Sequence, residues 1–348
     1  MAEQPNSMQG GEEKIPYKVI AEALQSGKVV PFLGAGASAA HRPPGAAWAP
    51  GAYFCPRGNE LANYLAKEAM FPDETGTDDL MLVASYFEAE PADRPTLQSK
   101  LDKIFCDGRL RPGPIHRLLA ACPNLRLIMT TNYDSLLEQA FKNKIHVVVD
   151  HGQEEWVNVR FRGDKIFSSR RKKELGRLLR EQSPVPTVFK LHGAAYKDDF
   201  EEEEKDPELR RFVLTADDYV RVLEKQINSM PAYFNTVLES CDSFLFLGYG
   251  LADWNVRVML SKIRRMAADA WRRSWAIQHN PLKSERKIWG NRGVNLYHCD
   301  LGEFVKAISQ ELGLAEVLGY TAQPPQIGTQ NLAKSRRKPF PLRPRQVR

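Results

Sequence analysis

Short, almost continuously apolar runs, each followed by glycine or polar residues, constrain the fold of this chain most. Three of them are "KVVPFLG" at 28–34, the run near 125–130 and "SFLFLGYG" at 243–250. Strands of this kind are buried on both faces, which is typical of a parallel sheet covered by helices. Helical patterns alternate with them along the chain. The sequence therefore predicts an α/β fold with a doubly wound, mostly parallel sheet and helical insertions.

The other predicted elements follow the same alternation. We expect further strands near 145–149, 186–193, 274–280 and 294–300. Helices are predicted at 17–27, 59–70, 79–89, 93–107, 115–121, 214–226, 253–267 and 301–312. Thr215 is a suitable N-cap for the sixth of these helices, with Asp218 at the N3 position of a capping box. The polar and basic residues 151–183 predict a surface insertion.

Bulk composition fits a globular protein of the cytoplasm. The chain has 348 residues, of which 43% are hydrophobic and 26% charged. No stretch approaches the roughly 20 consecutive apolar residues of a membrane helix. The first 14 residues are polar and acidic, without the pattern of a secretory signal. We therefore expect a cytoplasmic location, no membrane contact and a disordered N-terminus over residues 1–14.

The cysteines argue against a disulfide framework or a zinc module. There are five of them, widely spaced and without a C-x-x-C pair: Cys55, Cys106, Cys122, Cys241 and Cys299. Structural zinc sites and small disulfide-linked domains both need closely paired cysteines. We expect no metal site.

The net charge of +6 comes from the C-terminal tail. Lys334 to Arg348 contains seven lysines and arginines and no acidic residue, so the rest of the chain has a net charge of −1. The prolines of this segment predict a flexible arm over 317–348. It either binds nucleic acid or an acidic partner, or serves only as a solubilising end.

Four predicted strands end in residues that are unusual for simple turns. These strand ends are Gly34–Ser38, Thr130–Asp134, His192–Gly193 and Gly248–Asp253. In doubly wound sheets, ligands bind beyond the carboxyl ends of the strands. The fold would bring these four segments together along one crevice, and this convergence predicts a binding site.

The first segment, G-A-G-A-S, is typical of a phosphate-binding turn. Gly34 and Gly36 would let a pyrophosphate approach backbone N–H groups, and a helix beginning beyond them would add its positive end. The segment is not the dehydrogenase fingerprint G-x-G-x-x-G, because Ala39 stands where the third glycine would be.

Asn132 and His192 are the candidate catalytic residues. An asparagine amide can hold a water or a ribose hydroxyl but does not titrate, and a histidine can accept a proton near neutral pH. The structural alternatives are that Asn132 or Asp134 caps the helix beginning near Ser135, and that His192 is a hydrogen-bonded structural residue.

Three later strand ends are open to two interpretations. "FLGYGLADWN" ends in Gly248 and Gly250, with Asp253 before a helix, which resembles the first loop but also suits a glycine turn with an aspartate cap. "QHN" at 278–280 and "HCD" at 298–300 would either border an adenosine or form ordinary turns.

Taken together and in this order, the motifs resemble the sirtuin superfamily over roughly residues 17–313. They are G-A-G-A-S at 34–38, T-N-Y-D at 131–134, L-H-G at 191–193, L-T-x-x-D-Y at 214–219 and L-G-Y-G-x-x-D at 247–253. Sirtuins bind NAD and break its nicotinamide–ribose bond. The resemblance implies a Rossmann-like catalytic domain over 15–316, with 39–122 and 151–183 as helical or polar insertions.

The resemblance also assigns roles to single residues. Asn132 and Asp134 match the asparagine–aspartate pair at the nicotinamide end, and His192 matches the catalytic histidine. The residues implied in NAD binding are Gly34, Ala35, Gly36, Ser38, Thr131, Asp134, Gly248, Tyr249 and Asp253, with Asn280 and Asp300 at the adenosine end.

Departures from the family pattern predict a particular branch. The two C-x-x-C pairs of deacylating sirtuins are missing, and residues 41–66 do not continue as their first loop does. T-N-Y-D and L-G-Y-G look like the bacterial sirtuin-like NAD hydrolases of antiphage defence, which deplete NAD on infection (abortive infection) and work in assemblies. We expect a homo-oligomer and a partner in trans, either a HerA-type hexameric ATPase or, second, an Argonaute-type nucleic-acid sensor.

Three rival functions remain open at the level of sequence. The chain could be an NAD-dependent deacylase, against which the missing cysteine pairs argue. It could also be a non-catalytic module that senses NAD or ADP-ribose, or a nucleic-acid-binding protein acting through its basic tail.

Overall fold

The computed structural model describes a large part of the chain, and every structural statement below refers to that part. The described residues are 14–89, 94–141, 146–150, 157–160, 166–167, 186–195, 212–220, 237–238, 240–251, 257, 260–261, 274–315 and 318. The helices are α1 (Tyr17–Ser26), α2 (Ala35–Ala39), α3 (Gly58–Glu68), α4 (Leu80–Ala89), α5 (Arg94–Phe105), α6 (Pro114–Ala121), α7 (Leu136–Ala140), α12 (Lys283–Gly290) and α13 (Leu301–Glu311). The strands are β1 (Val29–Leu33), β2 (Leu127–Thr130), β3 (His146–Asp150), β4 (Val157–Arg160), β5 (Ile166–Phe167), β6 (Thr187–Lys190), β7 (Ser243–Leu247), β8 (Ser274–Gln278) and β9 (Val294–His298).

These strands form one nine-stranded sheet in the order β5-β4-β3-β6-β2-β1-β7-β8-β9. All pairings from β3 to β9 are parallel, while β4 and β5 continue the β3 edge in antiparallel register. Strands β2, β6 and β3 are added on one side of β1, and strands β7, β8 and β9 on its other side. The direction in which the sheet grows along the sequence therefore reverses between β1 and β7. This topology confirms the predicted doubly wound, mostly parallel fold and places its switch point at the β1–β7 pair.

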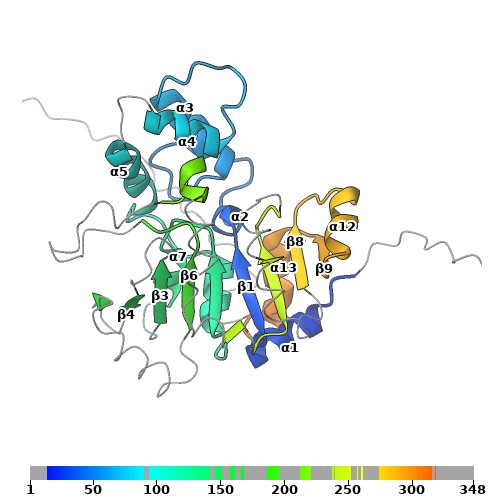
Figure 1. Ribbon diagram of the computed structural model, residues 1–348. Helices are drawn as coiled ribbons and strands as arrows, with labels where there is room; N and C mark the ends of the chain where they lie inside the picture. Colours follow the sequence, from blue (N-terminus) through cyan, green and yellow to red (C-terminus); the bar gives the residue numbers. More distant parts are fainter. Residues whose placement is uncertain are drawn as a thin grey trace, which may run out of the picture.

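Helices cover both faces of the sheet, as the apolar strands require (Figure 1). Along β1, Val29 and Leu33 face one core while Val30 and Phe32 face the other, and all four are at most 1% exposed. Helices α1, α6, α7 and α13 pack on the first face. The second face packs on α12 and on residues 237–238 and 260. Burial on both sides explains why no polar alternation marks these strands.

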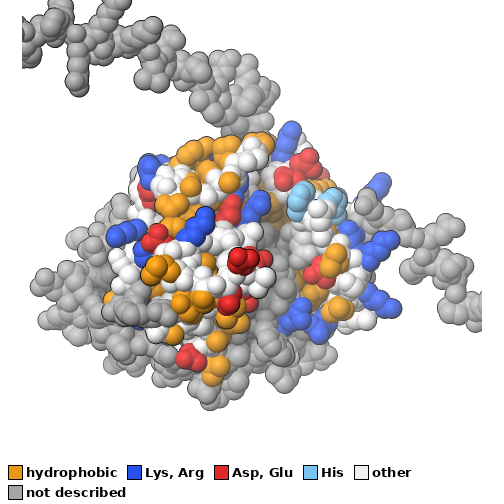
Figure 2. Space-filling view, turned by 90° about the horizontal axis from the view of Figure 1, so that it is seen from above, with side chains coloured by type: hydrophobic (Ala, Val, Ile, Leu, Met, Phe, Trp, Pro, Cys, Tyr) orange, Lys and Arg blue, Asp and Glu red, His pale blue; other side chains and the backbone are white. Residues whose placement is uncertain are grey.

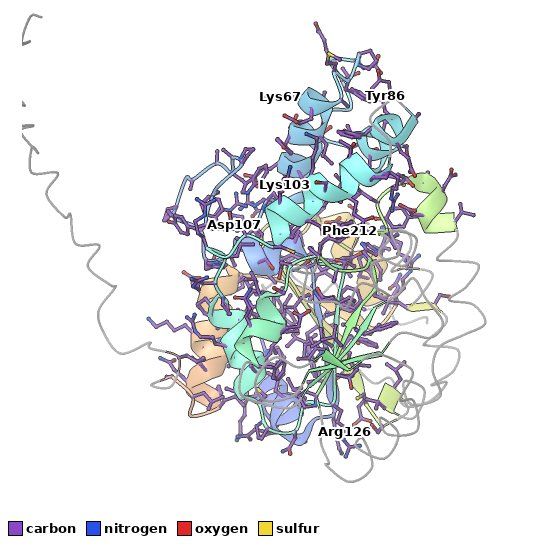
Figure 3. All side chains as sticks on the ribbon, turned by 90° about the vertical axis from the view of Figure 1, so that its left-hand side faces the viewer. Lys67, Tyr86, Lys103, Asp107, Arg126 and Phe212 are labelled. Carbon is purple, nitrogen blue, oxygen red and sulfur yellow. The ribbon has the colours of Figure 1, made fainter. Side chains whose placement is uncertain are left out.

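Helices α3, α4 and α5 form a separate group, called the helical module below. They stand above the carboxyl ends of the strands, with Phe212 near their base and Arg126 at the opposite end of the molecule (Figures 1 and 3). The module has its own apolar core, to which Tyr133 and Leu136 of the β2–α7 segment contribute. The helical module therefore lies over the carboxyl ends of the strands, whereas α6, also within the predicted insertion 39–122, packs on a face of the sheet.

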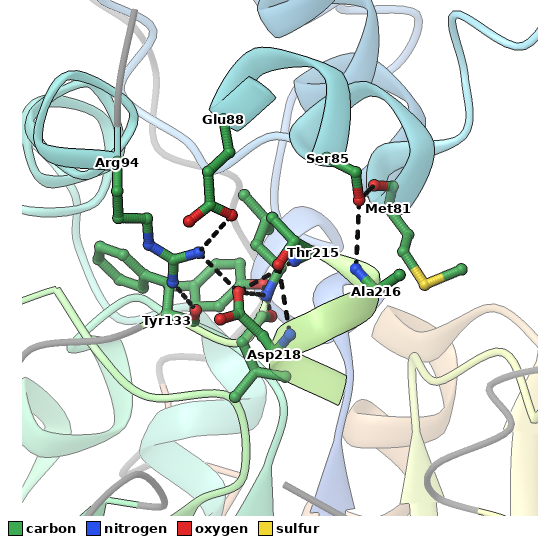
Figure 4. Close-up of polar contacts among 11 residues, drawn as sticks. Met81, Ser85, Glu88, Arg94, Tyr133, Thr215, Ala216 and Asp218 are labelled. Carbon is green, nitrogen blue, oxygen red and sulfur yellow. Dashed lines mark hydrogen bonds and ion pairs between the residues drawn. The ribbon is translucent and has the colours of Figure 1, made fainter. Parts of the chain in front are cut away.

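Arg94 connects the helical module to the segment that follows β6 (Figure 4). Its guanidinium lies 2.7 Å from Asp218 and 3.3 Å from Glu88, and it also donates to the Phe212 carbonyl. Asp218 accepts the Thr215 N–H at 3.1 Å, and the Asp218 N–H donates to Thr215 Oγ1 at 3.3 Å. These two bonds confirm the predicted capping box.

The structure contains elements that the sequence did not predict. β4 and β5 lie within the expected polar insertion. Helix α12 has one buried residue, Trp289, and its sequence therefore shows no apolar periodicity. The helix predicted at 253–267 lies largely outside the described residues, as do most of 151–183 and both chain ends.

We predict that Arg94→Gln destabilises the protein. The change leaves Asp218, which is 5% exposed, without its cationic partner. We expect a loss of about 2–3 kcal/mol in the free energy of unfolding, below the full effect of breaking an entirely buried pair because Arg94 keeps some exposure. Urea denaturation measures the change. The control is Arg109→Gln, whose ion pair with Asp107 is at the surface; equal losses in both variants would contradict the prediction.

Candidate active site

One cavity lies at the carboxyl ends of the central strands, beneath the helical module. Its volume is about 390 Å³, within the range of small-molecule sites. Nine of the thirteen residues proposed from sequence line it: Ala35, Gly36, Ser38, Thr131, Asn132, Asp134, His192, Gly248 and Tyr249. The fold thus gathers four distant segments at the switch point, while what each residue binds stays a prediction.

The loops that follow β1 and β7 cross in direct backbone contact. The Gly36 N–H donates to the Gly248 carbonyl at 2.9 Å, and the Gly34 N–H donates to the Leu247 carbonyl at 3.1 Å. A Cβ on Gly36 would lie 2.7 Å from Gly248 O, and one on Gly248, whose φ is +61°, would lie 2.2 Å from Ala37 N. The glycines are therefore required by this crossing. Both N–H groups already donate to backbone carbonyls, and α2 has only five residues. Phosphate binding by this loop therefore stays a prediction.

Ser38 is the centre of a buried hydrogen-bond network. Its hydroxyl donates to Asp134 Oδ2 at 2.7 Å and accepts from Asn132 Nδ2 at 2.9 Å. His116 Nε2 lies 3.4 Å from the same oxygen, and His116 Nδ1 accepts the Gly113 N–H at 3.1 Å. Since Nδ1 is an acceptor, the neutral ring carries its proton on Nε2 and donates to Ser38. This arrangement satisfies the hydroxyl completely, with one donated and two accepted bonds.

The same network fixes the orientation of the Asn132 amide. Its Nδ2 donates to the Gly34 carbonyl at 3.0 Å and to Ser38, and a carbonyl can only accept, so the amide cannot be flipped. Asn132 is 8% exposed, and its Oδ1 has no hydrogen-bond partner among the described residues. Asn132 lines the cavity, and its buried Oδ1 is an acceptor that the network leaves unused.

Asp134 serves the site indirectly. Its Oδ1 accepts the Leu136 N–H at 3.0 Å, so it caps the start of α7, as the structural alternative had it. Its Oδ2 holds Ser38, and through Ser38 it orients Asn132. The Cys55 thiol lies 3.8 Å from the same oxygen, and burial raises its pKa well above the ordinary value. Cys55 is therefore a protonated neighbour of the site and no thiolate nucleophile.

His192 lines the same cavity as Ser38, Asn132 and Asp134. It is 6% exposed, and its ring packs edge-on against Tyr219 at 5.3 Å and beside Tyr133 at 6.5 Å. Its carbonyl accepts the Val213 N–H at 2.9 Å, and Gly193 follows with a φ of +77°. The glycine lets the chain turn sharply after β6, which leaves the histidine at the cavity wall.

Tyr133 links the loop that carries Asn132 and Asp134 to the helical module. It stands between Asn132 and Asp134, but its ring packs into the core of the module against Phe105 and Phe212, at 5.4 and 5.1 Å. Its hydroxyl donates to the Val213 carbonyl at 2.8 Å. Val213 therefore connects the two loops, because its carbonyl bonds to Tyr133 and its N–H bonds to the His192 carbonyl.

Three of the proposed residues that the structure describes do not line the cavity. Gly34 contributes only backbone bonds beneath it. Asn280 is exposed after β8, and Asp300 caps α13 by accepting the N–H groups of Gly302 and Glu303. Asp253 lies outside the described residues. The adenosine-side assignments therefore stay predictions.

Sequence reasoning missed the part of the wall that the helical module supplies. These residues are Cys55, Pro56, Arg57, Gly58, Leu61, Leu80 and Phe105, joined by Tyr219. Tyr219 belongs to the quoted L-T-x-x-D-Y motif and could have been assigned from it. The others carry no local signal, because only the folding of the module over the strand ends brings them to the cavity.

The described residues contain neither a metal-binding cluster nor a membrane-spanning helix. No three His, Cys, Asp or Glu side chains there come close enough to hold a metal ion. No helix there has the length and hydropathy needed to span a bilayer. Seen from above, the described side chains mix apolar, acidic and basic groups rather than forming a basic surface (Figure 2).

Comparisons with known proteins agree with this geometry. Residues 126–297 match the model of the SIR2-like domain family. The chain is 28% identical over 261 residues to NAD(+) hydrolase ThsA of Acinetobacter baumannii (strain 532279), which covers 73% of this chain and 42% of the relative. With NAD(+) hydrolase ThsA of Enterococcus faecium it shares 27% over 279 residues, or 78% and 47%. With Defense-associated sirtuin 2 of Bacillus subtilis it shares 24% over 188 residues, or 53% and 15%.

The fold and cavity first define a class, a doubly wound α/β protein with a ligand site at its switch point. The matches then agree with the resemblance that its motifs predicted: residues 126–297, just under half of the chain, match the SIR2-like domain, and the relatives named above are 24–28% identical to it. The chain spans less than half the length of each of these relatives.

Buried His116 predicts a loss of stability in acid. Burial lowers its pKa from 6.5 to about 4, so the unfolded chain binds a proton here at pH values where the folded chain does not. The free energy of unfolding should fall as the pH drops from about 6.5 to about 4, by up to about 3 kcal/mol. Denaturant titrations across this range measure it. In His116→Gln this part of the slope should vanish, and an unchanged slope would contradict the assignment.

Proposed function

We propose that this protein is an NAD+ hydrolase that cleaves the nicotinamide–ribose bond and releases nicotinamide and ADP-ribose. The observation that carries the proposal is that Asn132 and His192 line one cavity, with a buried Asn132 Oδ1 that has no hydrogen-bond partner among the described residues. Two similar proteins named NAD(+) hydrolase support it.

The chemistry needs little from the protein beyond placement and exclusion of bulk water. Nicotinamide leaves NAD+ as a neutral molecule, so it needs no proton, and positive charge develops on the ribose. In this proposal Asn132 Oδ1, which has no partner among the described residues, accepts a hydrogen bond from the attacking water or a ribose hydroxyl. Its partial negative charge stabilises the cationic ribose. His192 accepts a proton from a ribose hydroxyl, a contribution typically worth about 100- to 10,000-fold.

The apolar part of the wall supports this mechanism. Leu61, Leu80, Phe105 and Tyr249 line the cavity beside the polar cluster. Apolar walls limit the number of water molecules near the reacting ribose and strengthen the remaining electrostatic contacts. The same walls suit a flat, weakly hydrated nicotinamide ring.

We propose further that the hydrolase acts in antiphage defence and depletes cellular NAD. A relative named Defense-associated sirtuin 2 supports this role. In the proposal the chain forms a homo-oligomer in the cytoplasm and works with a separate ATPase of the HerA type, with an Argonaute-type sensor as the second candidate. Co-purification of the tagged chain with each candidate partner, followed by light scattering, tests the assembly.

The test of the activity is NAD+ consumption by purified protein, with products resolved by chromatography. Asn132→Ala and His192→Ala should each reduce turnover by at least about 100-fold, because each removes a group that contacts the reacting ribose. Ser26→Ala is the control, since its exposed hydroxyl bonds only to the Ala23 carbonyl. Circular dichroism melts verify that all variants fold, and full activity in both cavity variants would refute the mechanism.

Two rivals separate in the same assay. NAD+ loss that requires an acylated peptide would favour a deacylase over a hydrolase. Binding of NAD+ without turnover, with the partner ATPase present, would favour a non-catalytic sensing module. Free nicotinamide and ADP-ribose from wild-type protein alone would exclude both.

A further inference from the structure

A fully buried ion pair lies directly beneath the catalytic loop. Lys190, the last residue of β6, is 1% exposed, and Glu138 of α7 is 2% exposed. Their Nζ and Oε1 atoms are 3.0 Å apart. Lys190 is also two residues before His192, so one strand end carries both side chains.

The Lys190 ammonium combines one ion pair with two hydrogen bonds. Besides the ion pair with Glu138, it donates to the backbone carbonyl of Asp134 and to that of Asn132, the latter at 3.4 Å. Both carbonyls belong to the loop that carries the Asn132 amide and the Asp134 carboxylate, and the ammonium therefore fixes that loop from below.

Stability alone gives no reason for charges at this position. Removing a lysine and a glutamate from water is expensive, and apolar side chains of the same size often replace such a pair without loss. What apolar side chains cannot supply is directional bonding to two backbone carbonyls. A buried carbonyl needs a donor, and here one side chain serves two carbonyls that flank Tyr133.

We propose that Lys190 is a positioning residue of the active site, with Glu138 as its counter-ion. It holds the Asn132–Asp134 backbone in a fixed position relative to His192, because Lys190 ends β6 and His192 follows two residues later. The catalytic consequence rests on the proposed hydrolase function, while the placement of the loop does not.

The experiment compares the single variant Lys190→Met with the double variant Lys190→Met/Glu138→Met. The single variant should melt at a much lower temperature, since Glu138 is left buried without a counter-charge. The double variant should recover most of that loss. Its kcat should nevertheless stay at least about tenfold below wild type with KM changed less than about threefold, because the loop is misplaced.

Amide hydrogen exchange supplies a readout that is independent of activity. The Asn132 N–H bonds to Thr130 Oγ1 and the Leu136 N–H to Asp134 Oδ1, so both report on the loop. In the double variant these amides should exchange at least about tenfold faster, while those of β1 keep their protection. The control is Lys100→Met/Glu68→Met, which removes an ion pair between α5 and α3 at the surface and should leave exchange and kcat unchanged.

The outcomes distinguish the two proposals. Wild-type exchange at Asn132 and Leu136 in the folded double variant would overturn the positioning role, whatever the activity. Wild-type kcat in that variant would overturn it as well. Faster exchange in a protein whose wild type never cleaves NAD+ would keep the role of Lys190 and refute the hydrolase.

Discussion

The architecture of this protein depends on the contact between two loops at the centre of its sheet. Gly36 and Gly248 cross so closely that a single methyl group on either would overlap the other backbone. This crossing joins the ends of β1 and β7 and brings the β2 and β6 ends beside them. The cavity lies beside this crossing, at the carboxyl ends of the strands around the switch point, where doubly wound sheets bind their ligands.

Below that cavity buried polar side chains bond to one another. Ser38 uses its whole bonding capacity on Asn132, Asp134 and His116, and Lys190 donates to two backbone carbonyls. In a buried region such bonds are expected, since an unmade hydrogen bond there costs about 1–3 kcal/mol. Asn132 Oδ1 has no hydrogen-bond partner among the described residues, and Asn132 lines the cavity.

The helical module gives the site its cover and its mechanical support. Tyr133 enters the module core from the middle of the catalytic loop, and Arg94 anchors the module to the segment after His192. A displacement of the module would thus act on both catalytic side chains at once.

The sequence by itself determined the sheet, its mostly parallel order and most of the polar residues at the cavity. Apolar runs define doubly buried strands, and the motifs at their ends are local in the chain, so both are legible without coordinates. Only the tertiary structure decided which atoms form hydrogen bonds. The Gly34 and Gly36 N–H groups bond within the loop crossing, and Asp134 Oδ1 caps α7. Asn132 Oδ1 has no partner among the described residues. The tertiary structure also brought Arg57, Leu80 and Phe105 to the wall, and Lys190 beneath the loop. Those relations join residues far apart in sequence, and their distances are fixed by packing across elements rather than by any local pattern.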